Sequence, residues 1–123
     1  MNEPGPLNPA AIERLCRLGG EKFASEMIGL FLSYGATKIA EARQAQQAGN
    51  LGALADAAHP IKSSAGNVGA IRVQELASLV EQTARQLQGD LANAQLGELE
   101  RAFVEAKSQL EKEKAKLATK AWG

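Results

Sequence analysis

The amino-acid sequence predicts an all-α protein, folded as an antiparallel up-down four-helix bundle with a short extra N-terminal helix. Apolar residues recur at spacings of three and four through each long segment, which is the period of an amphipathic helix. No segment alternates apolar and polar residues as a half-buried strand does. The 123 residues suit one domain. We expect an extended lead-in at residues 1–8, a folded domain at 9–118 and a frayed, charged tail at 119–123.

The first predicted helix is short. Asn8 is a suitable N-cap and Pro9 suits the first helical turn, so we expect a helix that ends at Leu18, before the glycine pair at 19–20. This helix would cover or flank the bundle. It carries the only cysteine, Cys16, which we interpret as a small packing residue. A single cysteine cannot form an internal disulfide, which favours a reducing compartment.

The second predicted helix begins at Glu21 and continues to Ala48, before Gly49. Its large apolar residues recur at helical spacing and are expected to form one buried face. They are Phe23, Met27, Leu30, Phe31 and Tyr34. We interpret this stripe as part of the core and not as a cofactor site.

Three further helices are predicted by the same periodicity. Asn50 is an expected N-cap for the third helix, and Gly69 suits its left-handed end. The apolar positions of the third helix are Leu54, Ala58, Ile61, Ala65 and Val68. Those of the fourth, which should end at Gly89, are Val73, Leu76, Val80, Thr83 and Leu87. Those of the last are Leu96, Leu99, Phe103, Ala106, Leu110 and Leu117.

The charge balance bounds the possible partners. The 14 basic residues match the 14 acidic residues, so nonspecific binding to nucleic acid or to an anionic membrane surface is not expected. The longest strongly apolar run, residues 27–32, is too short to span a bilayer, and the N-terminus lacks the pattern of a secretion signal. We therefore expect a cytoplasmic monomer that does not insert into membranes.

The only histidine, His59, lies on the third predicted helix. At about 100° of rotation per residue, Ile61 and Val68 fall roughly opposite it, which argues against a core histidine. The small and polar residues on its exposed side are Gly52, Ala55, Asp56, Lys62, Ser63 and Gly66. Such a surface leaves room for another protein to approach the ring. An ordinary solvated surface histidine and a packing role for Gly66 both remain open.

Lys62 is the charged residue that favours a functional interpretation of His59. It lies one turn after the histidine, and helical side chains lean toward the N-terminus, so its ammonium can reach back toward the imidazole. A cation there favours the neutral, nucleophilic ring and would pair with a negative group placed on it.

Several other chemistries lack the residues that they need. A metal site normally draws on several His or Cys ligands, and this chain has one of each, far apart. No glycine-rich phosphate loop is present. The nearest carboxylate to His59 in sequence, Asp56, lies beside no candidate nucleophile, so a hydrolytic site is not indicated.

The segment AAHPIKSSAGNVGA at residues 57–70 resembles the signature of histidine-containing phosphotransfer domains, which act in multistep two-component relays. The similarity extends from about Asn8 to Leu110. It includes LGGEKF before the second helix, the apolar run IGLFL, an Ala-Gly-Asn turn before the histidine helix, and a Leu-Val-Glu sequence that ends at Glu81.

This resemblance implies that residues 9–118 form a phosphotransfer domain. His59 would accept a phosphoryl group from the aspartyl phosphate of one receiver domain and pass it to the aspartate of another, and Lys62 would steady the phosphoryl oxygens. The small residues around them would form the docking surface. Its partners would be receiver domains of response regulators or a hybrid sensor histidine kinase. The partner would supply the Mg²⁺, so the domain needs no cofactor of its own and is not an enzyme.

Two residues depart from the family pattern. Pro60 stands where a helix-compatible residue is expected, and inside a helix proline removes one backbone hydrogen bond, so we predict a kink at residues 56–60. Ser63 stands where glycine is frequent, which we treat as neutral. Two alternatives remain: a helical adaptor that docks a partner without accepting phosphate, and an enzyme that uses His59 as a general base and turns over a small substrate unaided.

Overall fold

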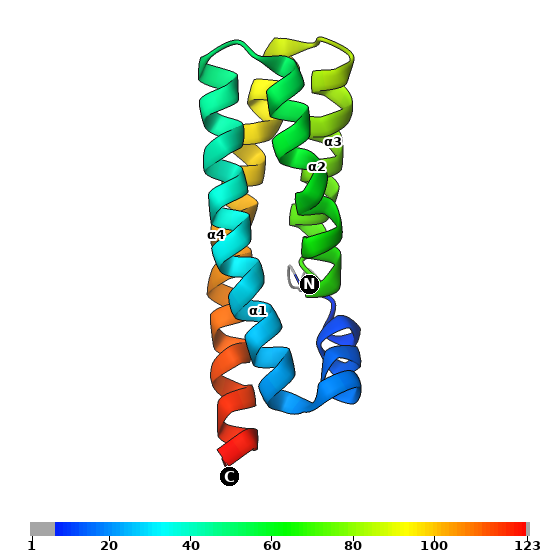
Figure 1. The fold of residues 1–123 in the computed structure, drawn as a ribbon, viewed down its shortest axis with the longest axis vertical. Coiled ribbons are helices and arrows are strands. Elements are labelled where there is room, and N and C mark those ends of the chain that lie inside the picture. Colours follow the sequence, from blue (N-terminus) through cyan, green and yellow to red (C-terminus); the bar gives the residue numbers. More distant parts are fainter. Residues whose placement is uncertain (1–6, 123) are drawn as a thin grey trace, which may run out of the picture.

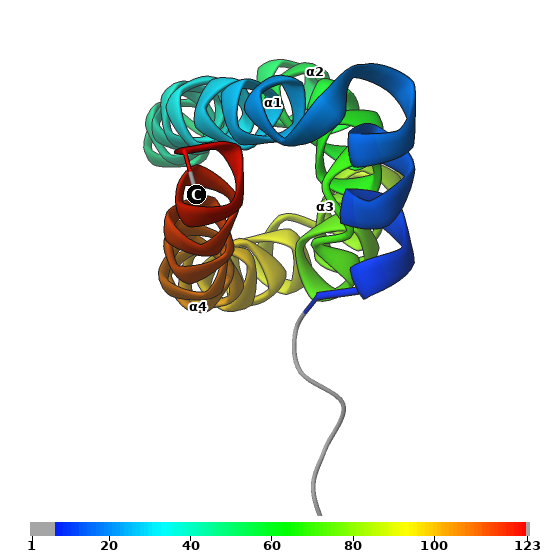
Figure 2. The ribbon, with the colours of Figure 1, turned by 90° about the horizontal axis from the view of Figure 1, so that it is seen from below.

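The computed structural model describes residues 7–122, which form a four-helix bundle (Figure 1). The helices are α1 (Pro9–Gln47), α2 (Leu51–Asn67), α3 (Ile71–Arg85) and α4 (Gly89–Trp122). They run alternately up and down, and Figure 2 shows them at the corners of a square. α1 and α3 each pack against both α2 and α4. The predicted all-α, up-down architecture is confirmed.

Gly20 divides α1 into two helical parts. Its backbone lies at φ 89° and ψ 175°, outside the helical region, and the chain reverses direction there. The first part begins as predicted, because Asn8 Oδ1 accepts a hydrogen bond from the Ala10 amide at 3.1 Å and Pro9 stands at the start of the helix. The predicted short N-terminal helix is therefore present, and it flanks the bundle below α2 and α3 (Figure 1).

This flanking helix compensates for unequal helix lengths. With 34 residues α4 is about 51 Å long, whereas α2 has 17 residues and a length of about 26 Å. The N-terminal helix covers apolar surface beyond the end of α2 by burying Ile12 and Leu15. Leu117 of α4 is also buried at this end. α4 continues through Trp122, so residues 119–122 of the expected frayed tail are helical in the structure; residue 123 lies outside the described residues.

The predicted core positions of α2 and α4 are all buried. Of the predicted buried face of α1, Phe31 is buried and Phe23 and Met27 pack partly buried against the core, but the prediction is wrong for Leu30 and Tyr34, which are exposed. The buried positions in this part of α1 are Ala24, Ile28, Phe31, Gly35, Ile39 and Ala42. Gly35 explains the difference, because the ring of Phe103 from α4 lies 2.7 Å from where a Cβ of Gly35 would be. The absence of a side chain at Gly35 thus allows α1 to pack closely against Phe103 of α4.

Three helices end in the same left-handed turn. Gly49 follows α1 at φ 70°, Gly69 follows α2 at φ 77°, and Leu87 follows α3 at φ 60°. In each turn the next amide donates back across the helix end, as Gln88 N does to Thr83 O at 3.0 Å. The prediction that Leu87 belongs to the core is wrong: it is 75% exposed, and α4 already begins at Gly89.

Replacing Leu87 with glycine should stabilise the protein. A leucine in the left-handed region is strained by its Cβ, and the exposed side chain contributes little burial, so Leu87→Gly should raise the free energy of unfolding by about 1 kcal/mol. Chemical denaturation measures this. The matched control is Gly49→Ala, which places a Cβ in open space at the same conformation and should lower the stability by a similar amount. A neutral or destabilising Leu87→Gly would contradict this account of the turn.

Candidate functional site

His59 lies in the middle of α2 and projects into solvent, with its side chain 63% exposed. Ile61 and Val68 are buried on the opposite side of the helix, as the helical wheel predicts. The histidine is therefore not a core residue. Its ring is open to a partner of any size.

The ring is held by a carboxylate from the neighbouring helix. Glu81 of α3 places Oε2 2.7 Å from Nδ1 of His59, and only 13% of the Glu81 side chain is exposed. An ionised carboxylate can only accept a hydrogen bond, so Nδ1 must carry the proton in this contact. In the neutral ring the other nitrogen, Nε2, then carries the lone pair. The contact with Glu81 thus favours the tautomer of neutral His59 in which Nε2 is the nucleophile.

Lys62, one turn after His59 on α2, binds the same carboxylate. Its Nζ lies 2.5 Å from Oε1 of Glu81. The sequence predicts that this ammonium reaches back toward the imidazole; in the structure it binds the carboxylate that anchors the imidazole. Lys62 therefore remains one turn from the ring, half-buried and available to a group that arrives at Nε2.

Arg85 and Asp56 complete a small charge network around Glu81. Nη2 of Arg85 lies 3.3 Å from Oε2 of Glu81 and 3.2 Å from Oδ1 of Asp56. Partial burial raises the pKa of Glu81, but the hydrogen bonds and charges of Lys62 and His59 together outweigh that effect. The net pKa of Glu81 lies below its ordinary value of 4.5, so the group is ionised at neutral pH.

Sequence reasoning did not identify Glu81 and Arg85 as site residues. Glu81 was noted only as the end of a Leu-Val-Glu sequence. The usable signal is topological: α2 and α3 are antiparallel and joined at Gly69, so residues nearly equidistant from that glycine lie side by side. His59 and Glu81 satisfy this condition. Arg85 lies one turn further along α3 on the same side.

The predicted docking residues differ in their exposure to solvent. Gly52, Asp56 and Ser63 are exposed on the His59 side of α2. Gly66 is half-buried, and a Cβ there would lie 2.7 Å from Nε2 at the end of the exposed Gln74 side chain, a contact that a shift of that side chain would relieve. The prediction that Ala55 lines the docking surface is wrong, because this residue is fully buried. Its side chain ends at Cβ, so closely packed helices cover it completely.

Pro60 does not break the helix. α2 is continuous from Leu51 to Asn67, so the distortion predicted at residues 56–60 does not interrupt the helix. Proline supplies no amide for the carbonyl of Asp56, but Asp56 lies on the exposed side of the helix, where water can take that place. His59 thereby keeps a helical orientation.

An apolar groove lies between α1 and the histidine helix. We call it the α1–α2 groove; its volume is about 140 Å³, and it is lined by Met27, Leu30, Phe31, Tyr34, Ser64, Asn67 and Val68. Leu30 is 63% exposed although it is apolar. Asn67 lies on the His59 side of α2, about two turns further on. The large residues expected in the core thus form an apolar border beside the site.

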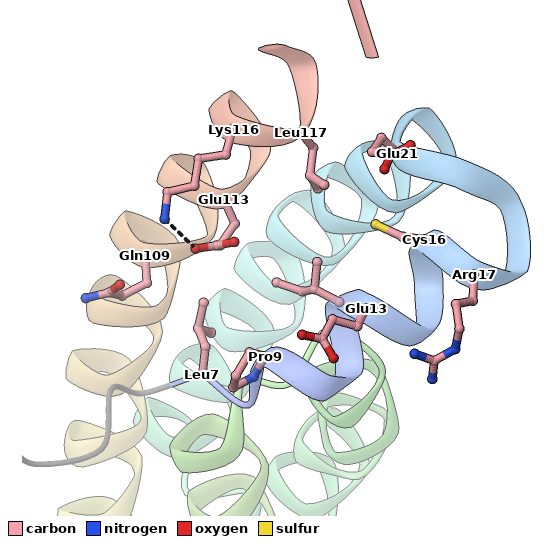
Figure 3. Close-up of a pocket in the computed structure, with 11 residues that line it drawn as sticks. Leu7, Pro9, Glu13, Cys16, Arg17, Glu21, Gln109, Glu113, Lys116 and Leu117 are labelled. Atoms are coloured by element: carbon pink, nitrogen blue, oxygen red, sulfur yellow. Dashed lines mark hydrogen bonds and ion pairs between the residues drawn. The ribbon is translucent and has the colours of Figure 1, made fainter. Parts of the chain in front are cut away.

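A larger hollow of about 520 Å³ lies at the other end of the bundle (Figure 3). Its lining comes from residues 7–21 and from the last turns of α4, and it contains the Glu113–Lys116 ion pair at 3.3 Å. Cys16 lines it and packs against the core, as predicted. No residue of α2 or α3 takes part, so this hollow is separate from the His59 site.

Across residues 7–122 there is no group of three or more His, Cys, Asp or Glu side chains that could hold a metal ion. Within the same range, none of the helices combines the length and hydrophobicity that a membrane span requires.

The helical bundle with an exposed His59 fits the histidine phosphotransfer domain that the sequence resembles. A model of the Hpt domain matches residues 26–116, and the chain belongs to that family. The role of the family is histidine phosphotransfer in phosphorelays, and its members are carriers whose partners are receiver domains.

Two solved structures share the fold. Histidine-containing phosphotransfer protein B from Pseudomonas aeruginosa PAO1 aligns with a TM-score of 0.83 and 23% identity, over 93% of this chain and 98% of that one. A rice structure described as a candidate histidine-containing phosphotransfer protein aligns with a TM-score of 0.82 and 19% identity, over 97% and 86%. No curated relative matches the chain by sequence.

The lowered pKa of Glu81 predicts a pH-dependent contribution to stability. The ionised carboxylate stabilises the fold above its ordinary pKa of 4.5, and this contribution is lost as the pH falls through the lowered folded-state value. The stability advantage of the wild type over Glu81→Gln should therefore shrink as the pH is lowered below 4.5. Denaturant titrations across this range measure it, with Glu75→Gln, an exposed site on the same helix, as the control. A constant difference would contradict the proposed ion pairs.

Proposed function

We propose that this protein is a phosphorelay intermediate that carries a phosphoryl group on Nε2 of His59 between receiver domains. It would accept the group from the aspartyl phosphate of one receiver and pass it to the aspartate of another. The observation that carries this proposal is the exposed His59 ring with Nδ1 engaged by Glu81, which leaves Nε2 as the free nucleophile.

The transfer needs little machinery from this chain. The Nε2 lone pair attacks phosphorus, the bond between phosphorus and the aspartate oxygen breaks, and its electron pair returns to the partner's carboxylate. Phosphoryl transfer depends mainly on positioning and charge neutralisation, so the receiver's acidic cluster and its Mg²⁺ would supply the rest. Lys62 would contribute the charge on this side, since its half-buried ammonium lies one turn from the ring and can exchange Glu81 for phosphoryl oxygens.

The surface around His59 suits a transient partner. Gly52 and Ser63 leave the ring accessible, and the α1–α2 groove adds an apolar border where Leu30 and Tyr34 are exposed. We propose that the receiver domain covers both regions, in an interface near the small end of specific complexes at about 1,200 Å². The protein would act as a cytoplasmic monomer that turns nothing over by itself.

Phosphorylation should depend on the one histidine. Incubation with a phosphorylated receiver domain and Mg²⁺ should transfer acid-labile, alkali-stable label to the wild-type protein and none to His59→Gln. Label is followed by autoradiography after gel electrophoresis, and circular dichroism confirms that the variant folds. Label retained by His59→Gln would sink the proposal. So would an unlabelled wild type against a broad receiver panel, which would favour a helical adaptor that only docks.

The groove should contribute to receiver binding without affecting the fold. Leu30→Asp places a charge in a contact that becomes buried on docking, so transfer from a receiver should slow by about tenfold or more, as expected when a buried apolar contact in an interface is lost. Rapid-quench kinetics at several receiver concentrations measure this. Leu18→Asp is the matched control, since Leu18 is as exposed as Leu30 but lies on the flanking helix. Equal rates for both variants would exclude the groove from the interface.

A further inference from the structure

Phosphorylation of Nε2 would change which ring nitrogen of His59 can gain or lose a proton, and the carboxylate of Glu81 faces that nitrogen. Phosphorylated Nε2 has no free lone pair, so Nδ1 is then the only ring nitrogen that can gain or lose a proton. Glu81 faces that atom with Oε2 at 2.7 Å. If the ring lost the Nδ1 proton, a nitrogen lone pair would face the ionised carboxylate of Glu81, which has no proton to donate. The geometry therefore opposes loss of this proton.

We propose that Glu81 keeps the proton on Nδ1 of phosphorylated His59 and thereby makes the phosphoryl group short-lived and readily transferred. This inference rests on the proposed function, because it concerns the phosphorylated form of His59. Glu81 acts through the imidazole and does not touch the phosphoryl group, so it is a positioning residue.

The chemistry of the leaving group explains the effect. When an acceptor attacks phosphorus, the bond between phosphorus and Nε2 breaks and its electron pair stays on Nε2. A ring protonated at Nδ1 leaves as neutral imidazole, and its Nδ1 proton remains in the hydrogen bond to Glu81. A ring without that proton would leave as an imidazolate anion, which is a far poorer leaving group. Keeping the proton therefore favours cleavage, both by a receiver aspartate and by water.

The carboxylate differs in this respect from the amide that has the same shape. Glutamine carries both an acceptor oxygen and a donor NH₂ group, so it can turn to satisfy Nδ1 with or without the proton. It would stabilise the unprotonated, unreactive ring that Glu81 disfavours. Glu81→Gln should therefore convert a reactive phosphohistidine into a longer-lived one while it preserves the packing between α2 and α3.

Asp56, another carboxylate in the same charge network, provides a control for the loss of negative charge in Glu81→Gln. Lys62 contacts Oε1 of Glu81, and Arg85 bridges Glu81 to Asp56. Asp56 belongs to the same network and has the same charge as Glu81, but its side chain is 77% exposed and its contact is with Arg85. Asp56→Asn thus removes one negative charge from this face without removing the acceptor at Nδ1.

The experiment loads the protein without a receiver domain. Potassium phosphoramidate donates its phosphoryl group to imidazole and releases ammonia, and His59 is the only histidine in the chain. Decay of the phosphohistidine signal is then followed by ³¹P NMR in wild type, Glu81→Gln and Asp56→Asn. Nitrogen-15 spectra of the ring report in parallel whether Nδ1 is protonated, which a purely structural role for Glu81 would leave unchanged.

The proposal predicts a phosphohistidine lifetime about tenfold longer in Glu81→Gln, the size expected for one charge-assisted hydrogen bond, with a ring that loses its Nδ1 proton. Asp56→Asn should behave like wild type. An equal or shorter lifetime in Glu81→Gln overturns the proposal, as does an equal lengthening in Asp56→Asn, which would assign the effect to general charge. If no receiver labels the protein while the lifetimes still differ, the relay function fails and the role of Glu81 at the ring stands.

Discussion

The hydrogen bond between Nδ1 of His59 and the carboxylate of Glu81 is the interaction on which the site depends. It links two helices, so it exists only because α2 and α3 pack closely in one register. Alanines at the core side of these helices, Ala58 and Ala77 among them, are fully buried and allow that close approach. The bundle thus holds His59 in one orientation at its surface, and under the proposed function most of the transfer chemistry would be supplied by the partner.

The sequence predicts most of the fold because the signals involved are local. Asn8 and Pro9 mark the start of a helix, the glycine pair at 19–20 marks its end, and the periodicity of α2 and α4 identifies their buried positions. His59 is placed on the exposed side of α2 by the same periodicity. These features depend on the neighbours along one helix and on no other part of the chain.

The errors arise where packing between helices decides the outcome. Leu30 and Tyr34 look like core residues by size, yet they are exposed, because α1 turns Gly35 toward α4 and the ring of Phe103 fills the space beside it. Ala55 looks like a surface residue by its place near His59, yet it is covered. Glu81 carries no signal of its own, since one glutamate on a helix is ordinary. Its role follows from its position opposite His59 of α2 in the folded bundle.

The charge network also determines how a partner first meets this surface. Asp56 and Glu81 carry two negative charges, and Lys62 and Arg85 carry two positive charges, so the cluster is electrically balanced when His59 is neutral. The whole chain is balanced as well. Under the proposed function, long-range electrostatic steering would therefore contribute little to the encounter with an acidic receiver pocket, and association would depend only weakly on ionic strength. Discrimination between receivers would then depend on short-range shape complementarity.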